Sequence, residues 1–500
     1  MVQPSPSYTV ALYLEVPASQ KAVARLVDTA TATGAIVTGV DVADADGDKL
    51  TVNLTADTRD SKHRNELVAK LEEIDGVVVR NVGDSTFLTH VGGKIEIASK
   101  YPIHNRRDLA RVYTPGVARV CKAIYDTPSK ARKLTIKRNT VAVVTDGTAV
   151  LGLGDIGPAA AMPVMEGKAV LFKQFGGVDA WPVALDTKDP DEIVAIVKAL
   201  APAYGGINLE DIKAPECFEI ETRLKEELDI PVMHDDQHGT AIISCAGLLN
   251  ACEVAGKRIE DVKVVINGAG AAAISCARLY LAFGLQQRNL IMLDSKGVIS
   301  TDRTDLNAQK REFATERTDV RTLAEAVQGA DVFVGLSKGN ILSQDMVRIM
   351  AERPIIFALA NPIPEISYED AREARADVIM STGRTDYPNQ INNVLGFPYI
   401  FRGALDTASS AINEPMKQAA VRAIADLARQ EVPAVVKEAY GVDHLEFGAD
   451  YFIPKPVDPR LVVEVSCAVA KAAIESGVAR KPITDWDAYR TQLEARIAKK

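Results

Sequence analysis

The first 90 residues alternate between apolar and polar positions in a way that predicts two similar units, each with strands and a helix. Alternation with a period of two predicts half-buried strands, and apolar residues recurring every three to four positions predict helices. An aspartate-rich turn joins the two middle strands. The predicted elements are strands over 8–16, 35–42, 49–56 and 77–82, and helices over 20–33 and 63–74.

This β-α-β-β-α-β order predicts a ferredoxin-like sheet with both helices on one face, as a domain over residues 1–95. The segment offers no nucleophile, acid pair or metal cluster of its own. It resembles an ACT domain, which implies a regulatory module that binds a small effector. A dimerisation module without a ligand is the alternative, and the fold analogy does not name an effector.

From residue 139 onward, buried strands end in glycine loops and are followed by helices, which is typical of α/β architecture. The pattern predicts a parallel, doubly wound sheet of Rossmann type, followed by a mainly helical C-terminal part. The clearest predicted elements are strands over 262–266, 289–294, 332–336, 355–358 and 378–380, and helices over 274–283, 414–429 and 458–475.

Charge and composition narrow the classes of function. The chain has 500 residues, of which 47% are hydrophobic, and a net charge of -9, so we expect two to four domains. Without a basic block, nucleic acid is not expected as a partner. With no long apolar run and no leader pattern we expect no membrane segment, and the six scattered cysteines favour a cytoplasmic location.

A glycine-rich loop predicts a dinucleotide site. Gly268-x-Gly270-x-x-Ala273 follows a buried strand and opens a helix, where backbone amides can face a pyrophosphate. Asp294 ends the next strand, and a carboxylate there can accept hydrogen bonds from ribose hydroxyls. NAD is therefore predicted over NADP, although Lys296 could instead pair with a 2′-phosphate.

Residues 101–240 contain candidate chemistry that the fold does not require. Tyr113 precedes a proline turn, and Lys168 lies inside an apolar run. Several carboxylates lie among apolar segments at 209–212 and 234–240, where unpaired charge is costly to bury. A hard cation such as Mg²⁺ or Mn²⁺ would remove that cost. A structural cluster paired with arginines is the alternative.

Zinc is not predicted at these carboxylates. His234 and His238 are four residues apart, but no HExxH motif is present and the residues between them are acidic. Both histidines are interpreted as hydrogen-bonding support.

Six segments in consistent order resemble the malic enzyme family of bacteria. They are YTPGVA at 113–118, TDGTAVLGLGDIG at 145–157, MEGKAVLFK at 165–173, EDI at 210–212, HDDQHGTA at 234–241 and NGAGAAA at 267–273. The resemblance runs from about residue 95 to 480. It implies a substrate domain over 96–250, an NAD(P)-binding domain over 251–480 and a helical tail over 481–500.

The resemblance implies that malate is oxidised with a nicotinamide cofactor and then decarboxylated. Lys168 would be the base, Asp235 would orient it, and Tyr113 would protonate the enolpyruvate. The implied metal ligands are Glu210, Asp211 and Asp236. The implied cofactor residues are Gly268, Ala269, Gly270, Ala271, Ala272, Ala273, Asp294 and Asn361, with Asn361 and Asn393 against the substrate.

A lysine must have its pKa depressed to act as a base near neutrality, which burial and a nearby cation promote. One departure from the family concerns the substrate carboxylate. Animal and plant relatives have an arginine where this chain has Val150. Arg106, Arg107 and Arg111 are available near the tyrosine, although a solvated basic face also explains them.

Two alternatives remain open at the level of sequence. A malolactic-type enzyme would use the same fold, metal and cofactor but reduce the pyruvate to lactate. A non-catalytic sensor would bind an effector in the first domain and a cofactor in the Rossmann half. A homodimer is the default expectation.

Overall fold

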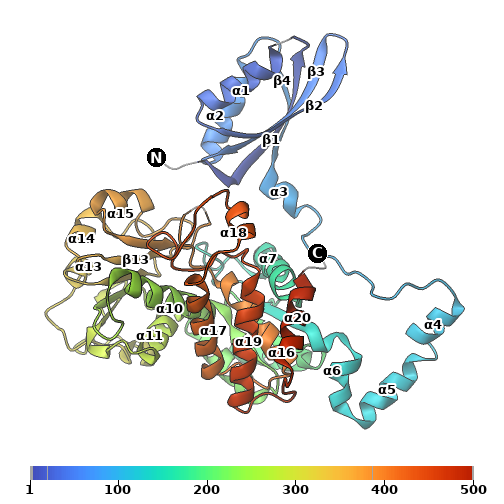
Figure 1. The fold of residues 1–500 in the computed structure, drawn as a ribbon, viewed down its shortest axis with the longest axis vertical. Helices are drawn as coiled ribbons and strands as arrows, with labels where there is room; N and C mark the ends of the chain where they lie inside the picture. Colours follow the sequence, from blue (N-terminus) through green and yellow to red (C-terminus); the bar gives the residue numbers. More distant parts are fainter. Residues whose placement is uncertain (1–3, 20, 386, 498–500) are drawn as a thin grey trace. The chain divides into compact units, whose positions relative to one another are not determined.

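A computed structural model describes residues 4–19, 21–385 and 387–497. The chain divides into two compact units, Met1–Ile97 and Ala98–Lys500, which are described separately (Figure 1). The division lies two residues beyond the predicted boundary at 95.

The N-terminal unit has the predicted order of strands and helices. It consists of β1 (Ser5–Pro17), α1 (Ala22–Ala32), β2 (Ile36–Asp46), β3 (Lys49–Thr58), α2 (Ser61–Glu72), β4 (Val78–Asp84) and the short helix α3 (Ser85–His90). The antiparallel sheet has the order β2-β3-β1-β4. Buried leucines of α1 and α2 share one core with the alternate residues of β1 and β3. Period-two alternation therefore places one face of this sheet against both helices.

The second unit begins with short helices and then forms a parallel sheet. The helices are α4 (Arg106–Val112), α5 (Val117–Asp126), η1 (Pro128–Lys130), α6 (Ala131–Leu134) and η2 (Ile136–Asn139). The sheet, in the order β6-β5-β7-β8, contains β5 (Thr140–Thr145), β6 (Asp179–Ala184), β7 (Gly206–Leu209) and β8 (Val232–His234). The intervening helices are α7 (Pro158–Gly176), α8 (Pro190–Leu200), η3 (Ala201–Ala203), α9 (Glu216–Glu227) and α10 (Asp235–Ala255).

A six-stranded sheet follows, in the order β11-β10-β9-β12-β13-β14. Its strands are β9 (Val264–Asn267), β10 (Leu290–Asp294), β11 (Gly297–Val298), β12 (Val332–Gly335), β13 (Ile355–Ala358) and β14 (Ile379–Thr382). All pairs are parallel except the pairing of β11 with β10. This parallel order confirms the predicted Rossmann-type sheet. Its strands are near-continuous apolar runs that are buried, as expected of a sheet covered on both faces.

Helices complete the second unit. They are α11 (Ala271–Ala282), η4 (Gln287–Asn289), α12 (Ala308–Arg311), α13 (Leu323–Val327), α14 (Gln344–Arg348), α15 (Tyr368–Ala374), η5 (Asn393–Leu395), α16 (Phe397–Asp406), α17 (Glu414–Ala428), α18 (Ala434–Ala439), α19 (Arg460–Glu475) and α20 (Trp486–Ile497). The predicted helices over 414–429 and 458–475 are α17 and α19. In the tail, α20 buries Tyr489 and Leu493.

The two sheets of this unit share one core. Buried residues of β5, α7, α10, β9 and α19 belong to a single cluster. The predicted boundary between 250 and 251 falls inside α10, so this helix belongs to both halves. Among the described residues, no helix combines the length and apolar character needed to cross a membrane.

Candidate active site

Lys168, which the sequence analysis placed inside an apolar run, lies in the middle of α7. The residue is only 9% exposed. Its Nζ lies 2.6 Å from Asp235 Oδ2, 2.8 Å from Glu210 Oε1 and 4.3 Å from the centre of the Phe397 ring. The long apolar run is therefore a buried helix that brings a single ammonium group to two carboxylates.

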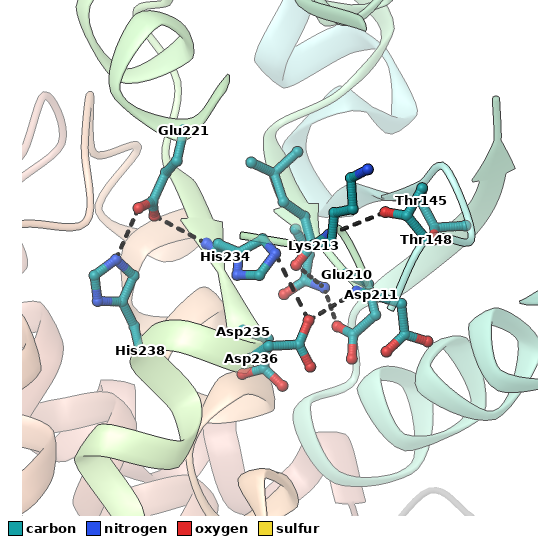
Figure 2. Close-up of polar contacts among 12 residues, drawn as sticks. Thr145, Thr148, Glu210, Asp211, Lys213, Glu221, His234, Asp235, Asp236 and His238 are labelled. Carbon is teal, nitrogen blue, oxygen red and sulfur yellow. Dashed lines mark hydrogen bonds and ion pairs between the residues drawn. The ribbon is translucent and has the colours of Figure 1, made fainter. Parts of the chain in front are cut away.

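The acidic residues come from the carboxyl ends of two neighbouring parallel strands. Glu210 and Asp211 follow β7, and Asp235 and Asp236 follow β8 as the first turn of α10. Because such strands end at the same sheet edge, the side chains meet there (Figure 2). Carboxylate oxygens of Glu210, Asp211 and Asp236 lie within 4.8 Å of one another.

Burial dominates the electrostatics of this cluster. It raises the pKa of Glu210 well above its usual value, although the charge of Lys168 acts the other way. Burial and the charge of Asp236 raise the pKa of Asp211 to about 7. For Lys168, burial alone would lower the pKa, but the carboxylates around it, Asp235 first, raise it above its usual value. The depressed lysine pKa expected of a base is therefore absent in this structure.

Two features of the acidic cluster are compatible with a bound cation. The buried Oδ2 of Asp211 and Oδ1 of Asp235 have no hydrogen-bond partner. Asp211 also has a left-handed backbone, with φ of 55°, which is uncommon for a residue with a side chain and costs energy. An all-oxygen donor set of three carboxylates suits Mg²⁺ or Mn²⁺. The predicted ligands Glu210, Asp211 and Asp236 fit such an ion.

Contacts that the sequence did not predict support the acidic loops. Asn208 donates to Glu210 Oε2 at 2.8 Å, and the main chain of Asp211 donates to Asp236 Oδ2 at 2.7 Å. Ala149 N in turn donates to Asp211 O at 2.9 Å, which ties residues 145–157 to the cluster. Period-two spacing on β7 puts Asn208 and Glu210 on one side of the strand, a signal available in the sequence.

The two histidines play different parts. His238 Nε2 lies 2.9 Å from the buried carboxylate of Glu221, which also accepts from His234 N at 3.0 Å (Figure 2). Hydrogen-bonding support is therefore found for the His238 ring. Among the described residues, the ring nitrogens of buried His234 have no hydrogen-bond partner, so the expectation is not met for this ring. Its Nε2 lies 3.6 Å from Asp236 Oδ2.

The glycine loop has the geometry that a pyrophosphate requires. Gly268 has a φ of 132°, and a Cβ there would lie 2.6 Å from Leu336 O, so a side chain does not fit. A Cβ on Gly270 would meet no atom within 4 Å, which leaves open space in front of α11. Residues 271–273 form the first turn of α11. Its amides are available to an anion.

Asp294 ends β10 as predicted, but its carboxylate is already engaged. Oδ1 accepts from Arg303 Nη1 at 2.8 Å and from Lys296 N at 2.9 Å. Oδ2 accepts from Arg303 Nη2 at 3.0 Å and from Lys310 Nζ at 2.7 Å. Partial burial raises the pKa of Asp294, but these hydrogen bonds outweigh it and hold the pKa at about 2. All four of its usual acceptor positions are occupied.

The two predicted asparagines make different contacts. Asn393 donates to Asp235 Oδ2 at 3.1 Å and accepts from Thr240 Oγ1 at 3.1 Å, so in this structure it holds Asp235. Asn361 precedes a cis proline, and its carbonyl oxygen lies so close to Gly152 that a Cβ there would be 2.2 Å away. Asn361 therefore joins the loop at 145–157 to the end of β13.

Tyr113 is not brought to this cluster within the chain. It caps the C-terminal end of α4 and is 68% exposed. Arg106, Arg107 and Arg111 lie on α4 and do not contact the cluster through any ion pair among the described residues. Val150, at the position of the missing arginine, is buried.

Comparison with known proteins places most of the chain in one family. Residues 92–225 match the model of the malic enzyme N-terminal domain, and residues 237–437 match that of the malic enzyme NAD-binding domain. The NAD-dependent malic enzyme of Geobacillus stearothermophilus is 54% identical over 90% of this chain and 91% of its own length. The NADP-dependent malic enzyme of Escherichia coli is 55% identical over 82% of this chain, and the aligned part covers 54% of the length of the Escherichia coli enzyme.

Solved structures agree with this placement. A malic enzyme from Pyrococcus horikoshii aligns with a TM-score of 0.74 and 41% identity, over 81% of this chain and 92% of its own. An NAD-dependent malic enzyme from Thermotoga maritima aligns with a TM-score of 0.71 and 43% identity, over 78% and 99%.

Proposed function

The chain belongs to the malic enzyme family, and on that premise we propose that it oxidises malate with NAD or NADP and decarboxylates the product to pyruvate and CO₂. The single observation that carries this proposal is the ammonium of Lys168, held between Asp235 and Glu210 at the edge of a three-carboxylate cluster. The glycine loop before α11 lies in the same unit. Oxidation of a hydroxy acid that is bound to a cation, beside a nicotinamide ring, needs this combination of groups.

Glu210, Asp211 and Asp236 would hold Mg²⁺ or Mn²⁺. When bound, the ion would polarise the malate hydroxyl, stabilise charge on the enolate oxygen and counter the carboxylates that raise the pKa of Lys168. The support is the set of buried, close carboxylates with an unpartnered Asp211 oxygen.

Proton transfer falls to Lys168 and Tyr113 in this proposal. In its neutral amine form, Lys168 Nζ removes the hydroxyl proton as C2 of malate loses its hydride to the nicotinamide ring, which gives oxaloacetate. Cleavage of the bond to the C4 carboxylate releases CO₂ and leaves enolpyruvate, which Tyr113 protonates at C3. Asp235 and Asn393 hold the ammonium in place, since Asn393 donates to the same Oδ2 that Lys168 contacts.

Cofactor preference depends on the surroundings of Asp294. NAD was predicted because a free carboxylate would bind ribose hydroxyls and repel a 2′-phosphate. That reason is weakened, because Arg303 and Lys310 already occupy the carboxylate and bring two positive charges. We propose that this cluster reads the adenosine ribose and decides between NAD and NADP.

We propose that the N-terminal unit is an ACT-like regulatory domain for a small effector. Its β-α-β-β-α-β order and its β2-β3-β1-β4 sheet support this assignment. A homodimer is also proposed, and the cytoplasmic location stays a prediction from the sequence.

One steady-state experiment tests the main proposal. Purified full-length protein is mixed with malate, Mn²⁺ and either NAD or NADP, and reduced cofactor and pyruvate are measured together. Equal accumulation of both supports the proposal. Lactate without net reduced cofactor would identify the malolactic alternative, and cofactor binding without turnover would identify a sensor.

A further inference from the structure

One buried acid outside the acidic cluster is not used by the mechanism proposed above. Glu365, on the loop between β13 and α15, is completely buried, and no ion pair among the described residues includes it. Burial raises the pKa of its carboxyl group, although hydrogen bonds from the main chain act in the other direction. Glutamate is almost never fully buried without a charged partner, because removing this group from water is costly. Such a position therefore requires a reason.

The two oxygens of this carboxylate connect the ends of two neighbouring strands. Oε1 accepts from Ser337 N at 3.2 Å, and Oε2 accepts from Ala360 N at 3.0 Å. Ser337 follows β12 and Ala360 follows β13, which are paired in parallel, so both amides lie at the same edge of the sheet. A Cβ on Gly335, the last residue of β12, would lie 2.2 Å from Glu365 Cδ. A glycine at 335 therefore leaves the room that the carboxylate occupies.

Ser337 lies beside the glycine loop of the candidate dinucleotide site. The sheet order places β10 and β12 on either side of β9, and ligands of such sheets bind where the strand order reverses in this way. Leu336 N donates to Asn267 O at 2.9 Å, and Asn267 Nδ2 donates to Ser337 Oγ at 2.6 Å. Leu336 O is also the atom that excludes a side chain at Gly268. One end of the bridge made by Glu365 is therefore fixed beside the glycine loop.

Ala360 belongs to the turn that reaches toward the acidic cluster. The next residue, Asn361, precedes a cis proline, and its carbonyl oxygen would lie 2.2 Å from a Cβ on Gly152. Gly152 belongs to a loop whose main chain donates to Asp211 O at 2.9 Å. The other end of the bridge is therefore tied to the side of the site where the substrate is expected.

We propose that Glu365 is a positioning residue for hydride transfer, whose carboxylate fixes the turn at Asn361 against the glycine loop and so sets the distance between the nicotinamide ring and C2 of malate. Reacting atoms must lie about 3–3.5 Å apart, and a displacement of about 1 Å can lower the rate about 10²-fold. The glycine loop would hold the dinucleotide, whereas Lys168 and the acidic cluster would hold malate. The placement of one ligand against the other then depends on the elements between them. This inference rests on the function proposed above.

The substitution Glu365→Gln changes the acceptors and keeps the size of the side chain. A glutamine has one acceptor oxygen and an NH₂ group that can only donate, so it cannot accept from both amides. One backbone amide is then left buried without a partner, which is costly. Ser337 is also held by its side-chain bond to Asn267, so we expect the turn at Asn361 to be released.

Ligand binding tests this role without turnover. Full-length wild type and Glu365→Gln are saturated with NADH or NADPH, whichever wild type binds more tightly, and the fluorescence anisotropy of the reduced ring is measured. Both proteins are also titrated by calorimetry with the matching ADP-ribose, which lacks this ring. We expect a lower anisotropy in the variant and an unchanged affinity for ADP-ribose, because only the ring side of the site is released. Unchanged anisotropy would overturn the proposal, and so would a loss of ADP-ribose affinity, which would show general damage to the glycine loop.

Kinetics with malate deuterated at C2 give a second readout. Well below the melting temperature, we expect kcat of Glu365→Gln to fall by about 10–10²-fold and its deuterium isotope effect to rise, since hydride transfer becomes slow relative to product release. A variant that melts earlier but keeps the wild-type kcat and isotope effect would overturn the proposal. Absence of malate turnover in wild type would instead refute the proposed function, and the anisotropy would still decide the role of Glu365.

Two further variants complete the test. Glu373→Gln, on α15, changes an exposed glutamate that accepts from Gln344 Nε2 at 3.0 Å, and it should behave as wild type in both measurements. Glu365→Asp keeps two acceptor oxygens on a shorter stem that cannot span both amides, so it should change both measurements in the same direction as Glu365→Gln. It takes the place of Glu365→Gln if that variant does not fold. Wild-type behaviour of folded Glu365→Asp would contradict the proposed bridge.

Discussion

The carboxylates at the two sheet edges of the catalytic unit differ in how much positive charge surrounds them. At the smaller sheet, Glu210, Asp211 and Asp236 are close together, and Lys168 forms an ion pair with Glu210. At the larger sheet, Asp294 alone is matched by Arg303 and Lys310. Burying surplus negative charge is costly, whereas a saturated carboxylate is stable without a ligand. The first edge therefore has surplus negative charge that a cation could offset, whereas the carboxylate at the second edge is already paired with positive charges.

The largest effect is expected at Lys168, the ammonium between Asp235 and Glu210. Lys168→Ala should lower kcat by about 10²–10⁴-fold, because it removes the group proposed to transfer the hydroxyl proton. Cofactor affinity, measured by fluorescence titration, should change little. A variant with wild-type turnover would disprove the base assignment and would leave the carboxylates without a catalytic partner.

Substitutions of the two glycines at the edge of the larger sheet should have different effects on stability. Gly268→Ala forces a side chain against Leu336 O at a positive φ, so it should destabilise the fold by about 1–3 kcal/mol and weaken cofactor binding. Gly270→Ala has room for its methyl group within the protein, so it should weaken cofactor binding alone. Thermal melting and cofactor titration of both variants make this test. Equal loss of stability would remove the distinction.

A measurement of Mn²⁺ affinity tests whether the surplus carboxylates at the smaller sheet bind a cation. Asp236→Asn removes one of three proposed ligands and should weaken Mn²⁺ activation by at least about tenfold. Glu219→Gln, an exposed carboxylate that pairs with Arg223 on α9, is the control and should leave it unchanged. An unaltered Mn²⁺ titration for Asp236→Asn would show that this side chain is not a ligand.

The smallest effect is expected where the charges already balance. Lys310→Gln leaves Arg303 on Asp294, so it should lower kcat/KM for NADP by only about tenfold, since one full charge-assisted contact is lost. Activity with NAD should be almost unchanged. Lys296→Gln, which pairs with Asp305 instead, is the matched control. An equal loss with both cofactors would mean that this cluster does not read the ribose.

Much of this contrast could be predicted from sequence because it depends on local order. An apolar strand that ends in glycine places its loop at a sheet edge, which located Gly268 and Asp294 correctly. Glu210 and Asp236 were named only through the family resemblance. The partners of Asp294 could not be predicted, because the loop and helix that carry Arg303 and Lys310 turn back in a way that spacing does not encode. Contact between Asn393 and Asp235 spans 158 residues and leaves no periodic signal.

Tyr113 shows a different limit. Its motif was recognised, but spacing and periodicity do not show whether the chain folds so as to bring Tyr113 to Lys168. The structure leaves it exposed on a segment without buried residues.

The continuity of α10 has a practical consequence for dissecting this protein. The helix begins with Asp235 and Asp236 and ends at Ala255, beyond the point where the two halves were expected to part. Its Asn250 donates to Ala425 O and Phe452 O, both at 2.9 Å, in the C-terminal half. A truncated fragment that stops at 250 would therefore end inside α10 and lack the last turn of this helix. Expression trials should keep residues 98–497 in a single chain.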